Sequence, residues 1–148
     1  MKSARRRSRE FALQGIYAWQ MAHSKIEEIA AQLATGKGFA RADAEYFRKL
    51  LRGAVAQAEE LEKLISPQLD RGIDSLSPVE RGILMLGAYE LRNESTIPFR
   101  VVINEAVELA KTYGGTDGHK YVNAVLNGLA ATLRPAEVEA DRAAGKAR

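Results

Sequence analysis

The sequence predicts an all-α protein, a compact bundle of six to seven helices. Apolar residues recur three and four positions apart along nearly the whole chain, as they do on the buried side of a helix. The strict apolar–polar alternation typical of a half-buried strand is hard to find. With 148 residues, of which 46% are hydrophobic, the chain can stabilise a core of its own. We expect a helical domain over residues 1–134 and a charged, disordered C-terminal tail over residues 135–148.

The first helix is expected over residues 5–22. Its buried side is the stripe of Ala12, Ile16 and Trp19, which are four and three residues apart. A second stripe at similar spacing consists of Arg6, Glu10, Leu13 and Tyr17. Arg6 and Tyr17 should therefore project from the same side of the helix, beside the buried stripe.

The next segments predict a short helix over residues 25–33, ended by "TGKG", and a long helix over residues 41–64. Pro67 ends the long helix, because proline lacks an N–H donor and disfavours helix in the residue before it. A further short helix is expected through residues 69–73.

The clearest local signal is the run "SPVERGILMLGAYEL". Ser77 is typical of a helix N-cap, Pro78 suits the first helical position, and Glu80 completes a capping box. These residues predict a helix that ends near Arg92.

Two more helices follow the loop "NESTIPF". One spans about residues 100–113 and ends at a Gly-Gly pair, and the other begins after Asp117, which we expect to be its cap. The apolar set of the last helix is Val122, Val125, Leu126 and Leu129. Beyond Pro135 only Val138 is strongly apolar, so this segment is expected to be frayed.

Positive charge is concentrated at the start of the chain. The net charge is +3, but residues 1–10 carry five basic side chains and one acidic one, so they contribute +4 and the remainder contributes −1. The arginines continue without Gly or Pro into a strong helical pattern, and their guanidinium groups bind phosphate through two parallel hydrogen bonds. We therefore predict contact with nucleic acid. A charged arm that only aids solubility and a targeting leader remain alternative interpretations.

Two further features favour single-stranded RNA as the nucleic acid. Tyr17 lies on the same side of the first helix as Arg6, and unstacked bases stack on exposed tyrosines. The second feature is the segment "YGGTDGHKYVN", where a Gly-rich turn leads into the free N–H groups of a helix beside Asp117, Lys120 and Tyr121. The same residues could instead only turn the chain and cap the helix, and Tyr17 could belong to the core.

Other classes of function find little support in the sequence. It has two histidines, no cysteine, and no Gly-rich phosphate loop, so we expect no catalytic residues, no metal site and no cofactor. No apolar run is long enough to span a membrane. We expect a soluble, cytoplasmic protein that is not an enzyme.

Four segments of the sequence resemble the signature blocks of the NusB family of bacterial transcription antitermination factors. They are "ARRRSRE.ALQGIYAWQ" (the dot stands for one residue), "LSPVERGILMLGAYEL", "IPFRVVINEAVELAKTYGG" and "DGHKYVNAVLNGLA", and the resemblance covers residues 2–134 in order. It implies two packed helical sub-bundles. It also implies binding of boxA RNA jointly with the ribosomal protein NusE, which helps RNA polymerase read through terminators, chiefly in rRNA operons.

The resemblance also implies which residues form the contacts. The arginine-rich start is the main RNA contact of the family and corresponds to Lys2, Arg5, Arg6, Arg7 and Arg9. The tyrosine of the first helix corresponds to Tyr17, and the loop before the last helix supplies Asp117 and Tyr121. Glu80 is the expected contact with NusE.

Two alternatives and one open question accompany this interpretation. The chain could be a scaffold that binds only proteins, or a fragment of an rRNA methyltransferase, since some of those enzymes begin with a NusB-like domain. The absence of cysteine and of a Gly-rich cofactor loop disfavours the methyltransferase. Members of the family occur as monomers and as homodimers, so the oligomeric state stays open.

Overall fold

Helices form where the spacing of apolar residues gives each segment one buried side. The computed structural model describes residues 2–146, and within that range it has eight α-helices, three 3₁₀ turns and no strand. The helices are α1 (Ala4–Ala22), α2 (Ile26–Leu33), α3 (Ala44–Ala56), α4 (Ala58–Ile65), α5 (Pro78–Asn93), α6 (Phe99–Tyr113), α7 (Gly118–Leu133) and α8 (Pro135–Lys146). The all-α prediction is confirmed, with one helix more than the upper number expected.

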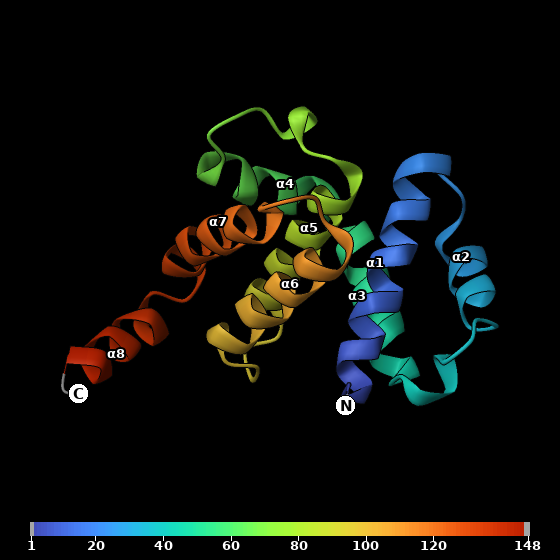
Figure 1. Cartoon of the computed structure of the whole chain (residues 1–148), viewed down its shortest axis with the longest axis horizontal. Coiled ribbons are helices and arrows are strands. Elements are labelled where there is room, and N and C mark those ends of the chain that lie inside the picture. The colour runs from blue at the N-terminus through green and yellow to red at the C-terminus, as the bar shows by residue number, and fades with distance from the viewer. Residues whose placement is uncertain (1, 147–148) are drawn as a thin grey trace.

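Helix α5 is the centre of the molecule. All ten residues from Gly82 to Leu91 are buried, as expected for a helix that is covered on all sides. Helices α1 and α3 pack against α5 and against each other, with α2 joined to both, while α4, α6 and α7 also pack against α5 (Figure 1). The first sub-bundle that the family resemblance implies is thus α1, α2 and α3, and the second is α4, α6 and α7, with α5 packed between them.

The start of α5 follows the predicted capping pattern in part. The Ser77 hydroxyl accepts a hydrogen bond from the N–H of Glu80 at 3.1 Å, and Pro78 is the first helical residue. The Glu80 carboxylate accepts a hydrogen bond from the Ser77 hydroxyl at 3.1 Å. In a complete capping box it would accept from the Ser77 backbone N–H.

The prediction of one long helix over residues 41–64 is wrong. The chain leaves helical geometry at Gln57 (φ −100°, ψ 10°), and the first half, α3, begins only at Ala44, where the Asp43 carboxylate caps it. Both halves pack against α5, but α3 lies mainly against α1 whereas α4 also lies against α7. The Gln57 side chain holds this break in place by accepting a hydrogen bond from the Asn93 amide at 3.0 Å.

The expected short helix through residues 69–73 is also wrong. Two 3₁₀ turns, Ser66–Gln68 and Ile73–Ser75, flank extended backbone at Leu69 and Gly72. The segment is a loop that crosses from α4 to α5 beside the start of α7 (Figure 1).

The C-terminal segment is helical where we expected a frayed tail. The buried Arg134 side chain donates to four main-chain carbonyl oxygens at the end of α5 and in the loop after it, those of Glu90, Leu91, Glu94 and Ile97. The Glu137 carboxylate accepts a hydrogen bond from the Phe99 N–H at 2.7 Å, which caps α6, and Val138 is buried. These contacts fix α8 to the body of the protein. Residues 147 and 148 of the expected tail lie outside the described residues.

Candidate nucleic-acid interface

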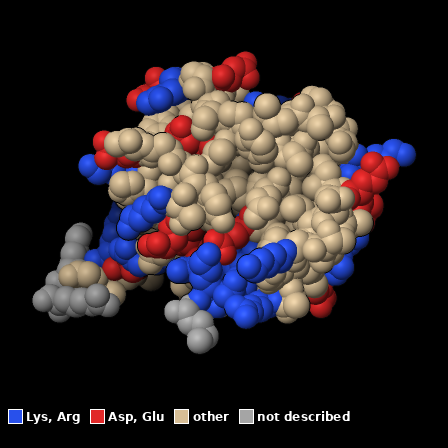
Figure 2. Space-filling view, turned by 45° about the vertical axis from the view of Figure 1, so that its right-hand side comes forward, with Lys and Arg blue, Asp and Glu red and all other residues tan. Residues whose placement is uncertain are grey.

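The basic N-terminal segment forms the first turns of α1. Ser3 caps the helix by accepting a hydrogen bond from the N–H of Arg6 at 3.0 Å. Lys2 pairs with Glu10 at 2.8 Å, and Arg6 forms two hydrogen bonds, of 2.9 and 3.1 Å, with the carboxylate of Glu105 on α6. Figure 2 shows Lys and Arg side chains gathered at this lower end of the molecule, with acidic side chains directly above them.

The other basic residues of this segment take different directions. The guanidinium of Arg5 lies 4.5 Å from the ring centre of Tyr46 on α3, on the side away from α6, and Arg5 is exposed. Arg7 is half-buried and has no ion pair within residues 2–146. The start of α1 is therefore surrounded by four cationic side chains that are accessible to an anionic ligand, those of Lys2, Arg5, Arg6 and Arg7. Together these four residues form the basic group of the surface.

Arg9 does not belong to this surface, contrary to the prediction. Arg9 is 4% exposed, and its side chain forms two hydrogen bonds of 2.8 Å with the carboxylate of Glu90, which also accepts from the Tyr46 hydroxyl at 2.6 Å. Periodicity contains the missed signal: Arg9 lies three residues before Ala12 and so extends the buried stripe of α1. The pKa of the Tyr46 phenol is raised by its burial and by the negative charge of the adjacent Glu90 carboxylate.

Acidic side chains hold the exposed cations in place. The Glu105 side chain is only 16% exposed, because Arg6 covers it. Hydrogen bonding to Glu105 and its negative charge raise the pKa of Arg6. Glu10 binds Lys2 and also accepts a hydrogen bond from the Tyr113 hydroxyl at 3.2 Å. The basic group is thus anchored at its α6 side, with part of each cation left open to solvent.

Tyr17 lies in an open groove above this basic group. The groove has a volume of about 350 Å³ and is lined by Leu13, Gln14, Tyr17, Leu33, Val79 and Tyr113. Tyr17 and Tyr113 are 43% and 41% exposed. As predicted, Arg6 and Tyr17 share one side of α1, since the first contacts α6 and the second shares a groove with the last residue of α6. No local sequence pattern marks Tyr113 as a site residue.

The turn into α7 holds the remaining predicted residues. Asp117 precedes α7 as predicted, but its backbone is left-handed (φ 62°) and its side chain makes no capping hydrogen bond; it pairs with Lys120 at 3.3 Å. The Tyr121 hydroxyl donates to Asp70 at 3.0 Å, and the guanidinium of Arg71 lies 4.5 Å from the centre of the Tyr121 ring. Asp70 and Arg71 come from the loop before α5, and nothing local in the sequence marks them.

Glu80 lies on the first turn of α5, next to the groove residue Val79. It contributes to raising the pKa of Arg71, whose guanidinium is bound chiefly by Asp70.

The exposed side chains of this surface include those of Lys2, Arg5 and Tyr17. Within residues 2–146, no group of three or more His, Cys, Asp or Glu side chains is placed to hold a metal ion. Among the helices described within residues 2–146, none combines the length and the hydropathy that a membrane-spanning segment requires. Exposed cations beside exposed tyrosines are suited to a ligand that combines phosphates with aromatic bases.

Comparison with known proteins identifies relatives along the whole chain. The model of the NusB family matches residues 6–131. The chain is 56% identical over 142 residues to the transcription antitermination protein NusB of Paraburkholderia phytofirmans, with 96% of this chain and 99% of that protein covered. It is 52% identical over 145 residues to the protein of the same name from Dechloromonas aromatica, with 98% and 89% covered.

Solved structures agree with the sequence matches. T. maritima NusB superposes with a TM-score of 0.80 at 31% identity, covering 94% of this chain and 99% of that one. A crystal structure of the antitermination factors NusB and NusE in complex with double-stranded RNA superposes with a TM-score of 0.79 at 30% identity, covering 86% of this chain and 96% of that one. The chain belongs to the NusB family.

Proposed function

We propose that this protein is a transcription antitermination factor that binds boxA RNA together with NusE and helps RNA polymerase read through terminators, chiefly in rRNA operons. The observation that carries the proposal is the exposed basic start of α1 beside an exposed tyrosine, Tyr17. The relatives' common name and the likeness to a NusB–NusE–RNA complex support it.

The phosphate contacts in this proposal come from Lys2, Arg5, Arg6 and Arg7. Each phosphate that these cations neutralise releases condensed counterions, so the slope of log K against log salt steepens by about −0.7 for every contact with a single strand. Glu10 and Glu105 fix the positions of Lys2 and Arg6 before RNA arrives, which lowers the entropy lost when the side chains bind. Arg9 acts only from within the core.

Sequence preference in this proposal comes from the aromatic and polar residues. Bases that are unstacked in single-stranded RNA can stack on Tyr17 and on Tyr121. Asp117 and Lys120 lie at the start of α7, where Asp117 can accept hydrogen bonds from base edges and Lys120 can meet a phosphate. Arg71 and Asp70 hold the Tyr121 ring in its orientation.

Glu80 is the proposed contact with NusE. It lies beside the groove on the first turn of α5, so a protein bound there would be adjacent to the RNA surface. A partner in that position would contact the same RNA, so the RNA would be bound by two proteins at once and with higher affinity.

Fluorescence anisotropy with labelled boxA RNA, measured with and without NusE, tests the proposal. We expect binding to the protein alone that weakens with salt, and tighter binding when NusE is added. A scrambled RNA of equal length should bind more weakly. Binding of NusE without any salt-sensitive RNA binding would instead identify a protein-only scaffold.

A further inference from the structure

The groove beside Tyr17 has the properties of a small ligand site. Its volume of about 350 Å³ lies at the lower end of the ~300–1,000 Å³ range of ligand pockets. Leu13, Leu33 and Val79 form its apolar lining, and none of the lining residues carries a charge. The groove is therefore unsuited to a phosphate and suited to a flat, neutral, largely apolar group.

Two tyrosine rings from different helices line this groove. Tyr17 comes from the middle of α1 and Tyr113 from the last turn of α6. Within residues 2–146 neither ring forms a ring–ring contact, so both are free to stack on a ligand. Glu10 accepts a hydrogen bond from the Tyr113 hydroxyl, which holds that ring from the side of the basic group.

We propose that this groove is a nucleobase subsite, in which one unstacked base of the bound RNA packs against Tyr17 and Tyr113. The inference deepens the proposed function and rests on it, because it assigns a base-binding role to Tyr113 and to the groove lining. The exposed amide of Gln14 lies at the groove and has both a donor and an acceptor for a base edge.

Continuity with the basic group identifies RNA as the occupant. Arg6 and Leu13 lie on one stripe of α1, seven residues apart, which is about 10 Å along the helix axis. Glu10 links the two regions directly, since one of its carboxylate oxygens binds both Lys2 and Tyr113. A strand whose phosphates contact Lys2 and Arg6 therefore passes the mouth of the groove.

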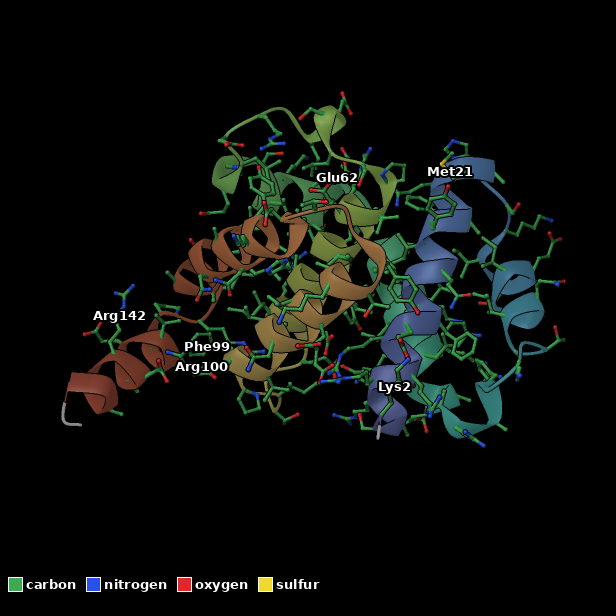
Figure 3. The ribbon with its side chains drawn as sticks, in the orientation of Figure 1. Lys2, Met21, Glu62, Phe99, Arg100 and Arg142 are labelled. Carbon is green, nitrogen blue, oxygen red and sulfur yellow. The ribbon has the colours of Figure 1, made fainter. Side chains whose placement is uncertain are left out.

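The other possible occupant is an apolar side chain of a partner protein, because Val79 adjoins Glu80. RNA binding measured without any partner separates the two. The variants are Tyr113→Leu, which keeps an apolar side chain but removes the ring, and Tyr113→Phe, which keeps the ring. Met21→Ala is the matched control, since Met21 is 58% exposed and lies at the opposite end of α1 from Lys2 (Figure 3).

The experiment combines these variants with boxA RNAs that each lack one base. In the wild-type protein, removal of the base that fills the groove should weaken binding by about 5- to 150-fold, the range of base–aromatic stacking. Tyr113→Leu removes one of the two rings, so it should weaken binding of intact RNA and reduce the effect of that one base removal. Tyr113→Phe, which keeps the ring but loses the hydrogen bond to Glu10, should retain most of the affinity that Tyr113→Leu loses. Met21→Ala should bind as the wild type does, and the salt slope should be unchanged in all three.

Other results overturn the inference. If Tyr113→Leu binds RNA normally while Lys2→Ala and Arg6→Ala variants lose affinity, the groove is not a base site although the RNA-binding function stands. If Tyr113→Leu reduces only the binding of NusE, the occupant is a protein side chain. Photocrosslinking of the wild-type protein with RNA that contains 4-thiouridine gives a readout independent of folding. A crosslink to Tyr17 or Tyr113 supports the inference, and crosslinks confined to other residues contradict it.

Discussion

Arg9 and Glu90 form a buried ion pair that joins α1 to α5. Two guanidinium nitrogens donate to the two carboxylate oxygens at 2.8 Å each, and the Tyr46 hydroxyl donates to the same carboxylate from α3. The pair therefore fixes three helices at the centre of the first sub-bundle. One arginine of the basic run is a structural residue, and its neighbours on α1 are positioned by it.

Replacing Arg9 should destabilise the protein strongly. Arg9→Ala leaves the Glu90 carboxylate buried without its counter-charge, a change that costs about 3–5 kcal/mol in comparable pairs. Urea denaturation measures the free energy of unfolding. Arg52→Ala is a matched control, because Arg52 pairs with Glu27 through the same two-bond geometry on the exposed surface, where such pairs contribute about 0–1 kcal/mol. Equal losses for the two variants would show that burial of the Arg9 pair has no special weight.

Replacing Glu105 should strengthen RNA binding. Glu105→Gln removes a negative charge next to the proposed phosphate path but keeps an oxygen that can accept a hydrogen bond from Arg6. We expect affinity for boxA RNA to rise about two- to fivefold at low salt, and the gain to shrink as salt screens the charge. Glu27→Gln, which removes an acid from the α2–α3 side, should leave RNA affinity unchanged. Weaker binding by Glu105→Gln would show that the positioning of Arg6 outweighs the repulsion.

Removing the Tyr121 ring should weaken RNA binding, whereas removing its hydroxyl should have little effect. Tyr121→Phe loses the hydrogen bond to Asp70 but keeps a ring beneath Arg71. Tyr121→Leu loses the stacking surface, so affinity for boxA RNA should fall about 5- to 150-fold. Anisotropy titrations of both variants give the comparison. A loss in Tyr121→Phe as large as that in Tyr121→Leu would assign the role to the hydroxyl.

The attachment of α8 should depend on pH. Partial burial of Glu137 opposes its ionisation, but the Phe99 N–H and the Arg134 guanidinium outweigh this effect, so the pKa of Glu137 lies below its ordinary value. Because the pKa is lower in the folded protein, the Glu137 carboxylate contributes its full stabilisation at pH values above the pKa of an unfolded glutamate, about 4.3. This stabilisation is lost as the pH falls through the lower pKa of the folded state.

Hydrogen exchange measures this attachment. At pH 7, Glu137→Gln should speed exchange of the Phe99 amide and of the α8 amides, because the neutral side chain is a weaker cap. Lowering the pH should reduce protection in the wild type, after correction for the intrinsic exchange rate, and change Glu137→Gln much less. Arg100, which lies next to Phe99 at the start of α6 (Figure 3), pairs with Asp141 of α8, so Arg100→Ala serves as a control for general loosening. The same pH response in wild type and Glu137→Gln would contradict the assignment to Glu137.

Elements with strong local signals could be predicted from the sequence. Helix α5 follows from Ser77 and Pro78, and α1 follows from its apolar spacing. The break at Gln57 could not be foreseen, because the apolar spacing continues on both sides of it without Pro or Gly at that position. Helix α8 depends on contacts of Arg134 and Glu137 with residues about 40 positions earlier, which no local pattern reveals.

The candidate interface was predictable in its composition but less so in its geometry. The charge run predicted Lys2, Arg5, Arg6 and Arg7, which lie around the start of α1 and whose contact with RNA stays a prediction. It also included Arg9, which is buried, because arginines on adjacent helix positions point in different directions. Tyr113 was not identified, because its role depends on the packing of α6 beside α1.

The salt dependence of RNA binding tests the central claim, that the exposed cations at the start of α1 bind RNA phosphates. Affinity for boxA RNA should be measured over a range of salt concentrations for the wild type, the double variant Lys2→Ala/Arg6→Ala, and the control Arg52→Ala. Loss of two phosphate contacts should weaken binding at low salt and flatten the log–log slope by about 1.4, whereas the control should match the wild type. An unchanged affinity and slope in the double variant would contradict the account.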